Sequence, residues 1–171
     1  SVFRHYDAFA AINPVVKAPT LVCDDGTVLM ESGLILEHLE SLASTSLWPA
    51  TGAARLQALR ATGLALAACE KTVQIVYELE LRPPEKQHAP WLERVRGQAE
   101  AAFDALEAEL ACTPWPRQAQ RLTQAGVSAA VAWSFAQRVL PGQLSTARGP
   151  HLADFTDWAE TLDVFTRAPM D

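Results

Sequence analysis

The feature that most restricts the fold of this chain is the Asp-Asp-Gly sequence at residues 24–26, which lies between two short apolar runs. Residues 21–23 (Leu-Val-Cys) precede it, and residues 28–30 (Val-Leu-Met) follow it. Asp and Gly both tolerate positive φ, so an Asp-Gly pair between apolar runs favours a β-hairpin. We therefore predict two antiparallel strands joined by a tight turn.

A helix is predicted directly after the hairpin. Ile35, Leu39 and Leu42 lie at helical spacing, which predicts one stripe of side chains that faces a core. Ser32 is expected to cap this helix, because its hydroxyl can accept a hydrogen bond from a backbone N–H that lacks a helical partner. Together these residues predict a β-β-α unit.

The residues of this region form the pattern Asn-Pro-x-x-Lys-x-Pro-x-Leu-x-x-Asp-Asp-Gly-x-x-Leu-x-Glu-Ser-x-x-Ile-x-x-x-Leu, which begins at Asn13. This pattern resembles the second half of the glutathione-binding domain of bacterial-type cytosolic glutathione S-transferases. The resemblance implies an α+β to mostly α fold. A thioredoxin-like glutathione-binding half, here reduced to about β-β-α, would be followed by an all-helical C-terminal domain.

The beginning of the chain is too short to supply the first half of that domain. In the family this half is a β-α-β unit that carries the catalytic Ser, Cys or Tyr, and such a unit takes roughly 30 residues or more. Residues 1–12 are expected to form an ordered lead-in and not a first strand. We therefore expect the β-α-β segment to precede residue 1 in the intact protein, and the catalytic residue stays unknown.

Two domains are predicted. Residues 1–43 would form the C-terminal part of the thioredoxin-like glutathione-binding domain, residues 44–50 a linker, and residues 51–171 an all-helical C-terminal domain. A proline and a cluster of Ser and Thr mark the linker as irregular. After the linker, Ala, Leu, Arg and Glu dominate, as expected of helices.

Four helices are predicted in the second domain, over about residues 52–81, 90–110, 124–139 and 151–166. The stripe expected to face the core in the first helix is Leu56, Leu59, Gly63, Leu66, Glu70, Val73 and Tyr77. In the second helix it is Leu92, Val95, Ala99, Phe103, Leu106 and Leu110. In the third and fourth it is Val127, Val131, Phe135 and Val139, and Leu152, Phe155, Trp158, Leu162 and Phe165.

Two glycines in these helices lead to separate predictions. Gly63 lowers helix propensity, which suggests the close approach of a neighbouring helix. The family resemblance implies a Ser or Thr cap followed by Asp at the start of the third helix, and this chain has Thr123 followed by Gly126. We expect Thr123 to form a weaker cap without a change of fold.

Charge and cysteine content limit the possible partners. A net charge of −6 argues against binding a nucleic-acid backbone, which requires a basic patch. No apolar run approaches the length of a membrane span, and no signal-peptide pattern is present.

Cys23, Cys69 and Cys112 are odd in number and widely spaced, which favours reduced thiols over a disulfide framework or a metal site. We expect a cytoplasmic location, no metal, and a structural role for each cysteine, with Cys23 as a small core residue.

Glutathione carries two carboxylates, one ammonium group and a thiol. The resemblance implies that Glu31 binds the ammonium group and that Ser32, at a helix N-terminus, binds a carboxylate; an ordinary helix cap is the alternative. Pro19 resembles the family's cis-proline, which would turn the backbone of Ala18 toward the cysteinyl part of glutathione; a trans proline at an edge strand is the alternative. Lys17 would pair with the glycyl carboxylate or lie solvated at the surface.

These residues indicate a glutathione S-transferase that uses glutathione as co-substrate and acts on small electrophiles. By resemblance it would be a homodimer. Tyr77 and Trp115 are candidates for the electrophile pocket, and core positions are the alternative for both. Two other functions stay open: a non-catalytic regulatory or partner-binding protein of the same fold, and a glutathione-dependent isomerase or dehalogenase. The presence of Glu31, Ser32, Lys17 and Pro19 favours glutathione binding over the first of these.

Overall fold

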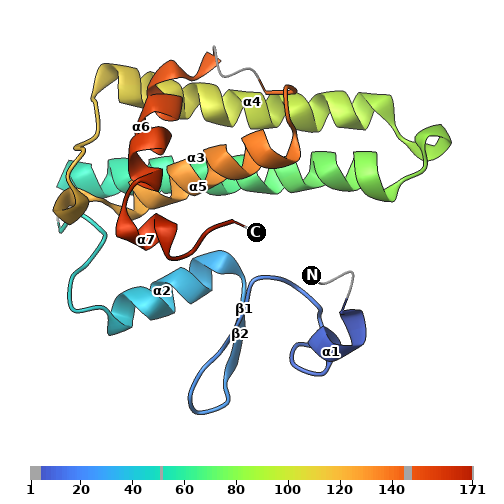
Figure 1. Cartoon of the computed structure of the whole chain (residues 1–171), viewed down its shortest axis with the longest axis horizontal. Coiled ribbons are helices and arrows are strands. Elements are labelled where there is room, and N and C mark those ends of the chain that lie inside the picture. The colour runs from blue at the N-terminus through green and yellow to red at the C-terminus, as the bar shows by residue number, and fades with distance from the viewer. Residues whose placement is uncertain (1–4, 51, 145–147, 171) are drawn as a thin grey trace. The chain divides into compact units, whose positions relative to one another are not determined.

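The computed structural model describes residues 5–50, 52–144 and 148–170, which are mostly helical with two short strands. The chain divides into two compact units, Ser1–Leu47 and Trp48–Asp171, and the division lies inside the segment 44–50. Figure 1 shows the course of the chain in each unit. Among the described residues, none of the helices combines the length and the hydropathy of a membrane span.

The first unit contains the predicted β-hairpin. In chain order it comprises α1 (Tyr6–Ala10), β1 (Thr20–Val22), β2 (Val28–Met30) and α2 (Ser32–Leu42). β1 and β2 are antiparallel, with Leu21 opposite Leu29. In the turn, Gly26 has a φ of 85°, and its N–H donates to the Cys23 carbonyl oxygen at 2.9 Å. The glycine of the Asp-Asp-Gly sequence therefore occupies the position that requires positive φ.

The cap of α2 differs from the prediction. Glu31 is the N-cap residue, and its carboxylate accepts a hydrogen bond from the Gly33 N–H at 3.1 Å, whereas Ser32 is the first helical residue. The backbone of Glu31 has a φ of 78°, which turns the chain into the helix before Ser32. A carboxylate supplies the same hydrogen bond as a serine hydroxyl, and its negative charge also suits the positive end of the helix.

The predicted apolar stripe of α2 is buried at Ile35 and exposed further along. Leu39 and Leu42 are 45% and 69% exposed, so their assignment to a core is wrong. Each strand has three residues and spans about 10 Å, whereas the 11-residue helix spans about 16 Å. The short sheet therefore covers the beginning of the helix and leaves its end exposed.

The second unit is built of helices. Its elements are α3 (Gly52–Val76), the π-helix η1 (Tyr77–Leu81), η2 (Pro84–Lys86), α4 (Ala89–Cys112), η3 (Ala119–Arg121), α5 (Gln124–Val139), α6 (Pro150–Glu160) and α7 (Asp163–Thr166). α3 packs along α4 and α5, and α5 packs against α6 (Figure 1). The predicted extents of the first three helices agree with the structure, and the last turn of the first is the π-helix η1.

The fourth predicted helix is divided in the structure. α6 ends at Glu160 and α7 begins at Asp163, so the prediction of one helix over residues 151–166 is wrong. At the break, the Thr161 hydroxyl donates to the Trp158 carbonyl oxygen at 2.7 Å, and Leu162 has an extended backbone with a ψ of 145°. Thr side chains compete in this way with the backbone hydrogen bonds of a helix, and apolar spacing alone does not report such a break.

α3 buries a different face from the predicted one. Its buried residues are mostly small: Ala58, Ala61, Thr62, Ala65, Ala68, Thr72 and Ile75. The predicted core residues Leu56, Leu59, Leu66 and Tyr77 are 69%, 48%, 37% and 46% exposed. A Cβ placed on Gly63 would meet open space, so the close helix approach predicted there is wrong as well. The neighbouring helices approach the alanine face instead, because alanine keeps helix axes at short separation.

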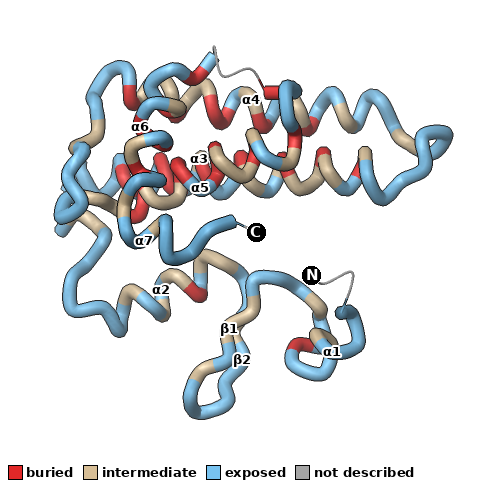
Figure 2. The backbone as a smooth tube through the Cα atoms, viewed as in Figure 1, coloured by how far each residue is buried: buried red, intermediate tan, exposed pale blue. Residues whose placement is uncertain are grey.

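α5 also buries small residues. Its buried face carries Ala125, Gly126, Ala129, Ala130, Ala132, Trp133 and Ala136, whereas the predicted core residue Val131 is 44% exposed. α4, in contrast, buries the predicted stripe at Val95, Ala99, Phe103, Leu106 and Leu110. In Figure 2 the buried residues of α3, α4, α5 and α6 lie where these helices face one another. Small residues on α3 and α5 and larger residues on α4 therefore make the core.

Thr123 caps α5 as predicted. Its hydroxyl accepts a hydrogen bond from the Gly126 N–H at 3.3 Å. A Cβ at Gly126 would lie 3.1 Å from both Leu122 Cδ1 and Phe155 Cζ. The position at which an Asp would complete a capping box is thus enclosed by apolar side chains, and the threonine provides the cap.

Two helices of this unit begin on carboxylates that other helices supply. Glu78 of η1 is 5% exposed and accepts a hydrogen bond from the His88 N–H, directly before α4, at 2.7 Å. Glu107 of α4 accepts from the N–H groups of His151 and Leu152, in the first turn of α6, at 3.1 and 2.8 Å. Burial alone would raise the pKa of Glu107, but the hydrogen bonds from His151 and Leu152 outweigh it and lower that pKa. Each carboxylate satisfies N–H groups that a helix start leaves unpaired.

Glu107→Gln is expected to lower the free energy of unfolding by about 1–2 kcal/mol near pH 7, because the neutral amide is a weaker acceptor for the first N–H groups of α6. A carboxylate whose pKa is lowered on folding stabilises the protein above its unfolded pKa, and this contribution is lost as the pH falls through the lowered value. The difference between the variant and the wild type should therefore shrink below about pH 4. Urea unfolding over a range of pH measures both effects.

Glu93→Gln is the matched control, because Glu93 lies exposed on the same helix. This change should alter the free energy of unfolding by less than about 0.5 kcal/mol. A Glu107→Gln protein that loses the same stability at every pH would contradict the role of the carboxylate charge.

Candidate functional site

The loop before β1 is held in place by Asn13, which is 3% exposed. Its side-chain amide donates to Thr20 Oγ1 at 2.9 Å and to the Lys17 carbonyl oxygen at 3.4 Å. Its Oδ1 accepts a hydrogen bond from the Val15 N–H at 3.0 Å, and its Nδ2 also lies 3.7 Å from the sulfur of Met30 on β2. One buried side chain therefore connects the loop with both strands.

The loop ends in the cis peptide bond that the sequence predicts between Ala18 and Pro19. Lys17, Ala18 and Pro19 are all exposed. The Lys17 carbonyl oxygen accepts a hydrogen bond from the Thr20 hydroxyl at 2.7 Å, which ties the segment to β1. The segment thus presents an exposed lysine and a cis peptide bond between two exposed residues.

Val16 and Glu31 have positive φ, 52° and 78°, and no other non-glycine residue in the described ranges does. A β-branched residue such as valine rarely adopts this conformation, because its side chain crowds the backbone. Such conformations cost on the order of 1–3 kcal/mol and cluster at functional sites. Val16 directly precedes Lys17, and Glu31 directly precedes Ser32, so both strained residues adjoin the predicted glutathione-binding residues.

The hairpin brings these two segments together. Thr20 pairs with Met30 at the end of the ladder, so Pro19 and Glu31 lie at the same end of the hairpin. Glu31 is exposed and Ser32 is half-buried, and both follow the strand that pairs with the one after Pro19. The hairpin therefore brings the Lys17–Pro19 and Glu31–Ser32 segments to one end of the first unit.

The site combines groups for both charges of a small zwitterion. The Glu31 carboxylate can accept hydrogen bonds from an ammonium group, and the Lys17 ammonium can pair with a carboxylate. Ser32 and the N–H groups at the start of the 11-residue helix α2 favour a second carboxylate, assisted by the helix dipole. Exposed backbone at Ala18 can pair with a peptide. The arrangement suits a small peptide with two carboxylates and one ammonium group.

The structure does not bring Tyr77 and Trp115 together. Trp115, between α4 and η3, packs edge-on against Phe155 at 5.2 Å and lines a cavity of about 650 Å³ that reaches Ala61 on α3. Tyr77 lies in η1, sixteen residues beyond Ala61 and so about 24 Å further along the helix. Trp115 lines this cavity and Tyr77 does not, so the structure does not place the two predicted residues in one cavity.

Known proteins share this fold. The protein-family model for the glutathione S-transferase N-terminal domain matches residues 1–47 of this chain. A glutathione transferase family member from Pseudomonas fluorescens Pf-5, solved with bound glutathione, is 28% identical over 96% of this chain and 79% of that chain, with a TM-score of 0.81. Another structure from this organism, with bound S-(propanoic acid)-glutathione, is 30% identical over 93% of this chain and 81% of that chain, with a TM-score of 0.78. This chain belongs to the glutathione transferase family.

A further glutathione S-transferase, from Methylobacterium radiotolerans JCM 2831, was solved in complex with glutathione sulfonate. It is 28% identical over 94% of this chain and 75% of that chain, with a TM-score of 0.81. A comparison with curated proteins found no match to this chain. In this glutathione transferase family member the match to the N-terminal domain is followed by a helical C-terminal region, as the resemblance implies.

Sequence reasoning missed two features of this candidate site in the family member. The role of Asn13 as the anchor of the loop was not predicted, although its place at the start of the motif, before Pro14, was a usable signal. The positive φ of Val16 carries no local signal, because valine disfavours that conformation. Only the surrounding hydrogen bonds of the loop can hold Val16 in it.

Asn13→Ala is expected to loosen the segment 14–20, because the Lys17 carbonyl and the Thr20 hydroxyl lose a buried donor. The free energy of local opening should fall by about 1–3 kcal/mol. Amide hydrogen exchange of this segment measures the change, and the Val15 amide should show it most directly.

Asp25→Ala is the control for this measurement. It removes a comparable bond from the Thr27 N–H, 2.8 Å long, in the hairpin turn and outside the site. Equal exchange of residues 14–20 in the two variants would show that Asn13 does not anchor the loop.

Proposed function

We propose that the protein binds glutathione and transfers it to small electrophilic compounds in the cytoplasm, as a detoxifying transferase. The observation that carries this proposal is the pairing of Thr20 with Met30, which brings Lys17–Pro19 and Glu31–Ser32 to one end of the hairpin. Three solved structures of relatives that hold glutathione or its derivatives support it. The three cysteines are free, which suits a compartment where thiols stay reduced.

Each group of glutathione has a partner in this proposal. Glu31 binds the ammonium of the γ-glutamyl end, and Ser32 with the first N–H groups of α2 binds its carboxylate. The backbone of Ala18, before Pro19, pairs with the cysteinyl residue. Lys17 pairs with the glycyl carboxylate. The thiol is then left free to react.

In the proposed reaction the sulfur of bound glutathione attacks an electrophilic carbon and forms a thioether, and the thiol proton leaves with the displaced group. No residue of this chain is assigned to stabilise the glutathione thiolate. The cavity beside Trp115 is the better of the two predicted positions for an electrophile, because it is hollow and lined by apolar as well as polar side chains.

Glu31→Ala and Ser32→Ala are each expected to weaken glutathione binding by about 1–3 kcal/mol, with the larger loss for Glu31, because charge-assisted hydrogen bonds are lost. Isothermal calorimetry with glutathione measures the affinities. Glu31 also caps α2, so Glu31→Gln is the sharper variant: it keeps an oxygen for the Gly33 N–H and removes the charge.

Glu37→Ala and Ser41→Ala are the matched controls on exposed positions of the same helix. They should leave glutathione affinity unchanged. Wild-type affinity in the Glu31 and Ser32 variants would exclude this site. A wild-type protein that binds glutathione and conjugates a chloronitroaromatic compound is a transferase, whereas glutathione-dependent isomerisation or dehalogenation would indicate the isomerase or dehalogenase class. A protein that does not bind glutathione would favour a partner-binding role.

We further propose that the protein forms a homodimer. The residues Leu56, Leu59, Leu66 and Tyr77, which we term the α3 stripe, lie exposed on one face of the helix and its π-helical extension. Leu34 of α2 and Val22 of β1 are 59% and 53% exposed. Large apolar side chains that gather on one surface mark interaction sites, and two-fold dimers are the commonest assembly. The exposed hairpin and α2 of one subunit would meet the long helices of its partner.

Leu59→Glu is expected to convert the dimer into a monomer, because a charge in the apolar contact would be buried without a partner. Sedimentation velocity across a range of concentrations measures the oligomeric state. Val164→Glu, at an exposed position of α7, is the control and should leave the dimer intact. A monomeric wild type, or a dimeric Leu59→Glu protein, would contradict this use of the α3 stripe.

A further inference from the structure

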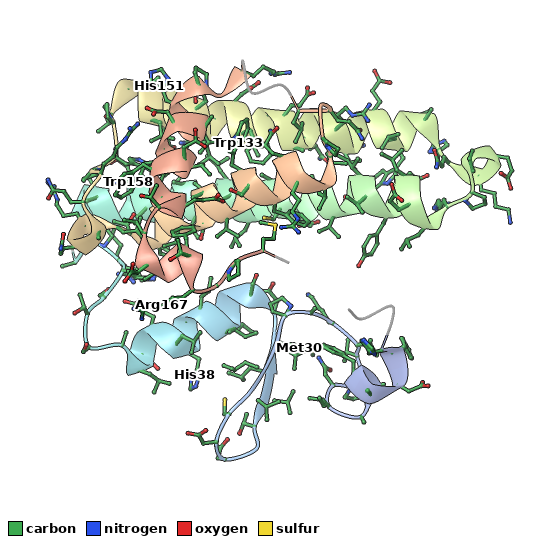
Figure 3. The ribbon with its side chains drawn as sticks, in the orientation of Figure 1. Met30, His38, Trp133, His151, Trp158 and Arg167 are labelled. Carbon is green, nitrogen blue, oxygen red and sulfur yellow. The ribbon has the colours of Figure 1, made fainter. Side chains whose placement is uncertain are left out.

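Cys23 and His38 form a thiol–imidazole pair in the first unit. Cys23 directly follows β1, His38 belongs to α2, and Cys23 Sγ lies 3.7 Å from His38 Nε2, which is hydrogen-bond distance for sulfur. His38 extends from α2 on the side of the hairpin (Figure 3). Both residues are half-buried, so the sequence interpretation of Cys23 as a core residue is wrong. A thiol beside a base and open to solvent has the geometry of an activated nucleophile.

The hairpin turn fixes the position of the sulfur. The Cys23 N–H donates to the Thr27 carbonyl oxygen, and the Cys23 carbonyl accepts from the Gly26 N–H, both at 2.9 Å. Asp25 lies in the same turn and accepts a hydrogen bond from the Thr27 N–H at 2.8 Å. Hydrogen bonds from Thr27 lower the pKa of Asp25, and the positive charge of His38 adds to this effect.

The other two cysteines have different surroundings. Cys69 lies partly buried on α3, and burial raises its pKa to about 11. Cys112 is exposed at the end of α4. One chain thus contains a thiol beside an imidazole, a thiol suppressed by burial and an exposed thiol, and these three can be compared in one sample.

We propose that Cys23 is a nucleophilic thiol that forms mixed disulfides with small disulfide compounds, with His38 as its base. His38 Nε2 accepts the proton of Cys23, and Sγ attacks one sulfur of the compound. The bond between Cys23 and that sulfur forms as the sulfur–sulfur bond of the compound breaks. The departing thiolate takes the proton from His38 and leaves as a thiol. Cys23 is oxidised, and the disulfide compound is the oxidant.

This site is separate from the proposed glutathione site, because none of Lys17, Pro19, Glu31 or Ser32 takes part in the reaction. A small thiol reverses the modification by attacking the mixed disulfide and releasing the Cys23 thiol. The modification would therefore record the ratio of small disulfides to small thiols around the protein. It places a bulky group on the hairpin turn, next to α2.

The test uses the whole chain and hydroxyethyl disulfide, an uncharged compound that does not resemble glutathione. Samples are quenched at intervals by acid, the remaining thiols are alkylated, and peptide mass spectrometry follows Cys23, Cys69 and Cys112 separately. Cys23 should react about tenfold faster than Cys112 or more, as expected for a thiol with a positioned base. Cys69 should react slowest, and its protection also reports that the fold is intact.

His38→Asn should reduce the rate at Cys23 to about that of Cys112 and leave the other two rates unchanged. Cys23→Ser should abolish the fast phase and retain the glutathione affinity of the wild type, which separates this proposal from the proposed function. A wild-type Cys23 that reacts no faster than Cys112 would overturn the proposal without any variant. A folded His38→Asn protein with an unchanged Cys23 rate would overturn the role of the imidazole.

Discussion

The close contact of α3 with α4 and α5 determines the rest of the helical unit. Alanines on the buried faces of α3 and α5 let these helices pack closely, and α4 and α6 supply most of the larger core residues. Phe103 meets Trp133 edge-on at 5.2 Å, and Phe155 meets Trp158 at 5.3 Å. Because the small residues face inward, Leu56, Leu59 and Leu66 of α3 face outward. The same packing therefore forms the core and creates the apolar surface that we assign to a partner subunit.

The first unit achieves its geometry with few residues. Two strands of three residues cannot bury much apolar surface, and Asn13 and Ile35 are its buried residues within the described range. Its order depends on directed polar bonds: the Asn13 amide holds the loop, and the Glu31 carboxylate begins α2. Groups that bind charged ligands are placed by such bonds more accurately than by apolar contact, whose energy depends little on direction.

The parts of the fold that depend on local chemistry could be predicted from the sequence, and those that depend on neighbours could not. Local backbone preferences account for the Asp-Asp-Gly turn, for the end of the first long helix before Pro83 and for the start of α4 near Pro90. The buried face of α3 depends on how closely other helices approach, so the leucine stripe at Leu56 and Leu59 was misleading. In the candidate site, the motif predicted the Lys17–Pro19 and Glu31–Ser32 segments, which the hairpin register brings to one end. The positive φ of Val16 and the separation of Tyr77 from Trp115 result from tertiary structure.

The carboxylates of Glu78 and Glu107 also connect the formation of one helix with that of the next. The start of α4 requires a residue of η1, and the start of α6 requires a residue of α4 that is more than forty positions earlier in the chain. α6 therefore gains its full stability after α4 has folded, and α4 after η1. This dependence makes the folding of the helical unit cooperative. Loss of η1 would destabilise the start of α4 and, through α4, the start of α6, although η1 and α6 are distant in sequence.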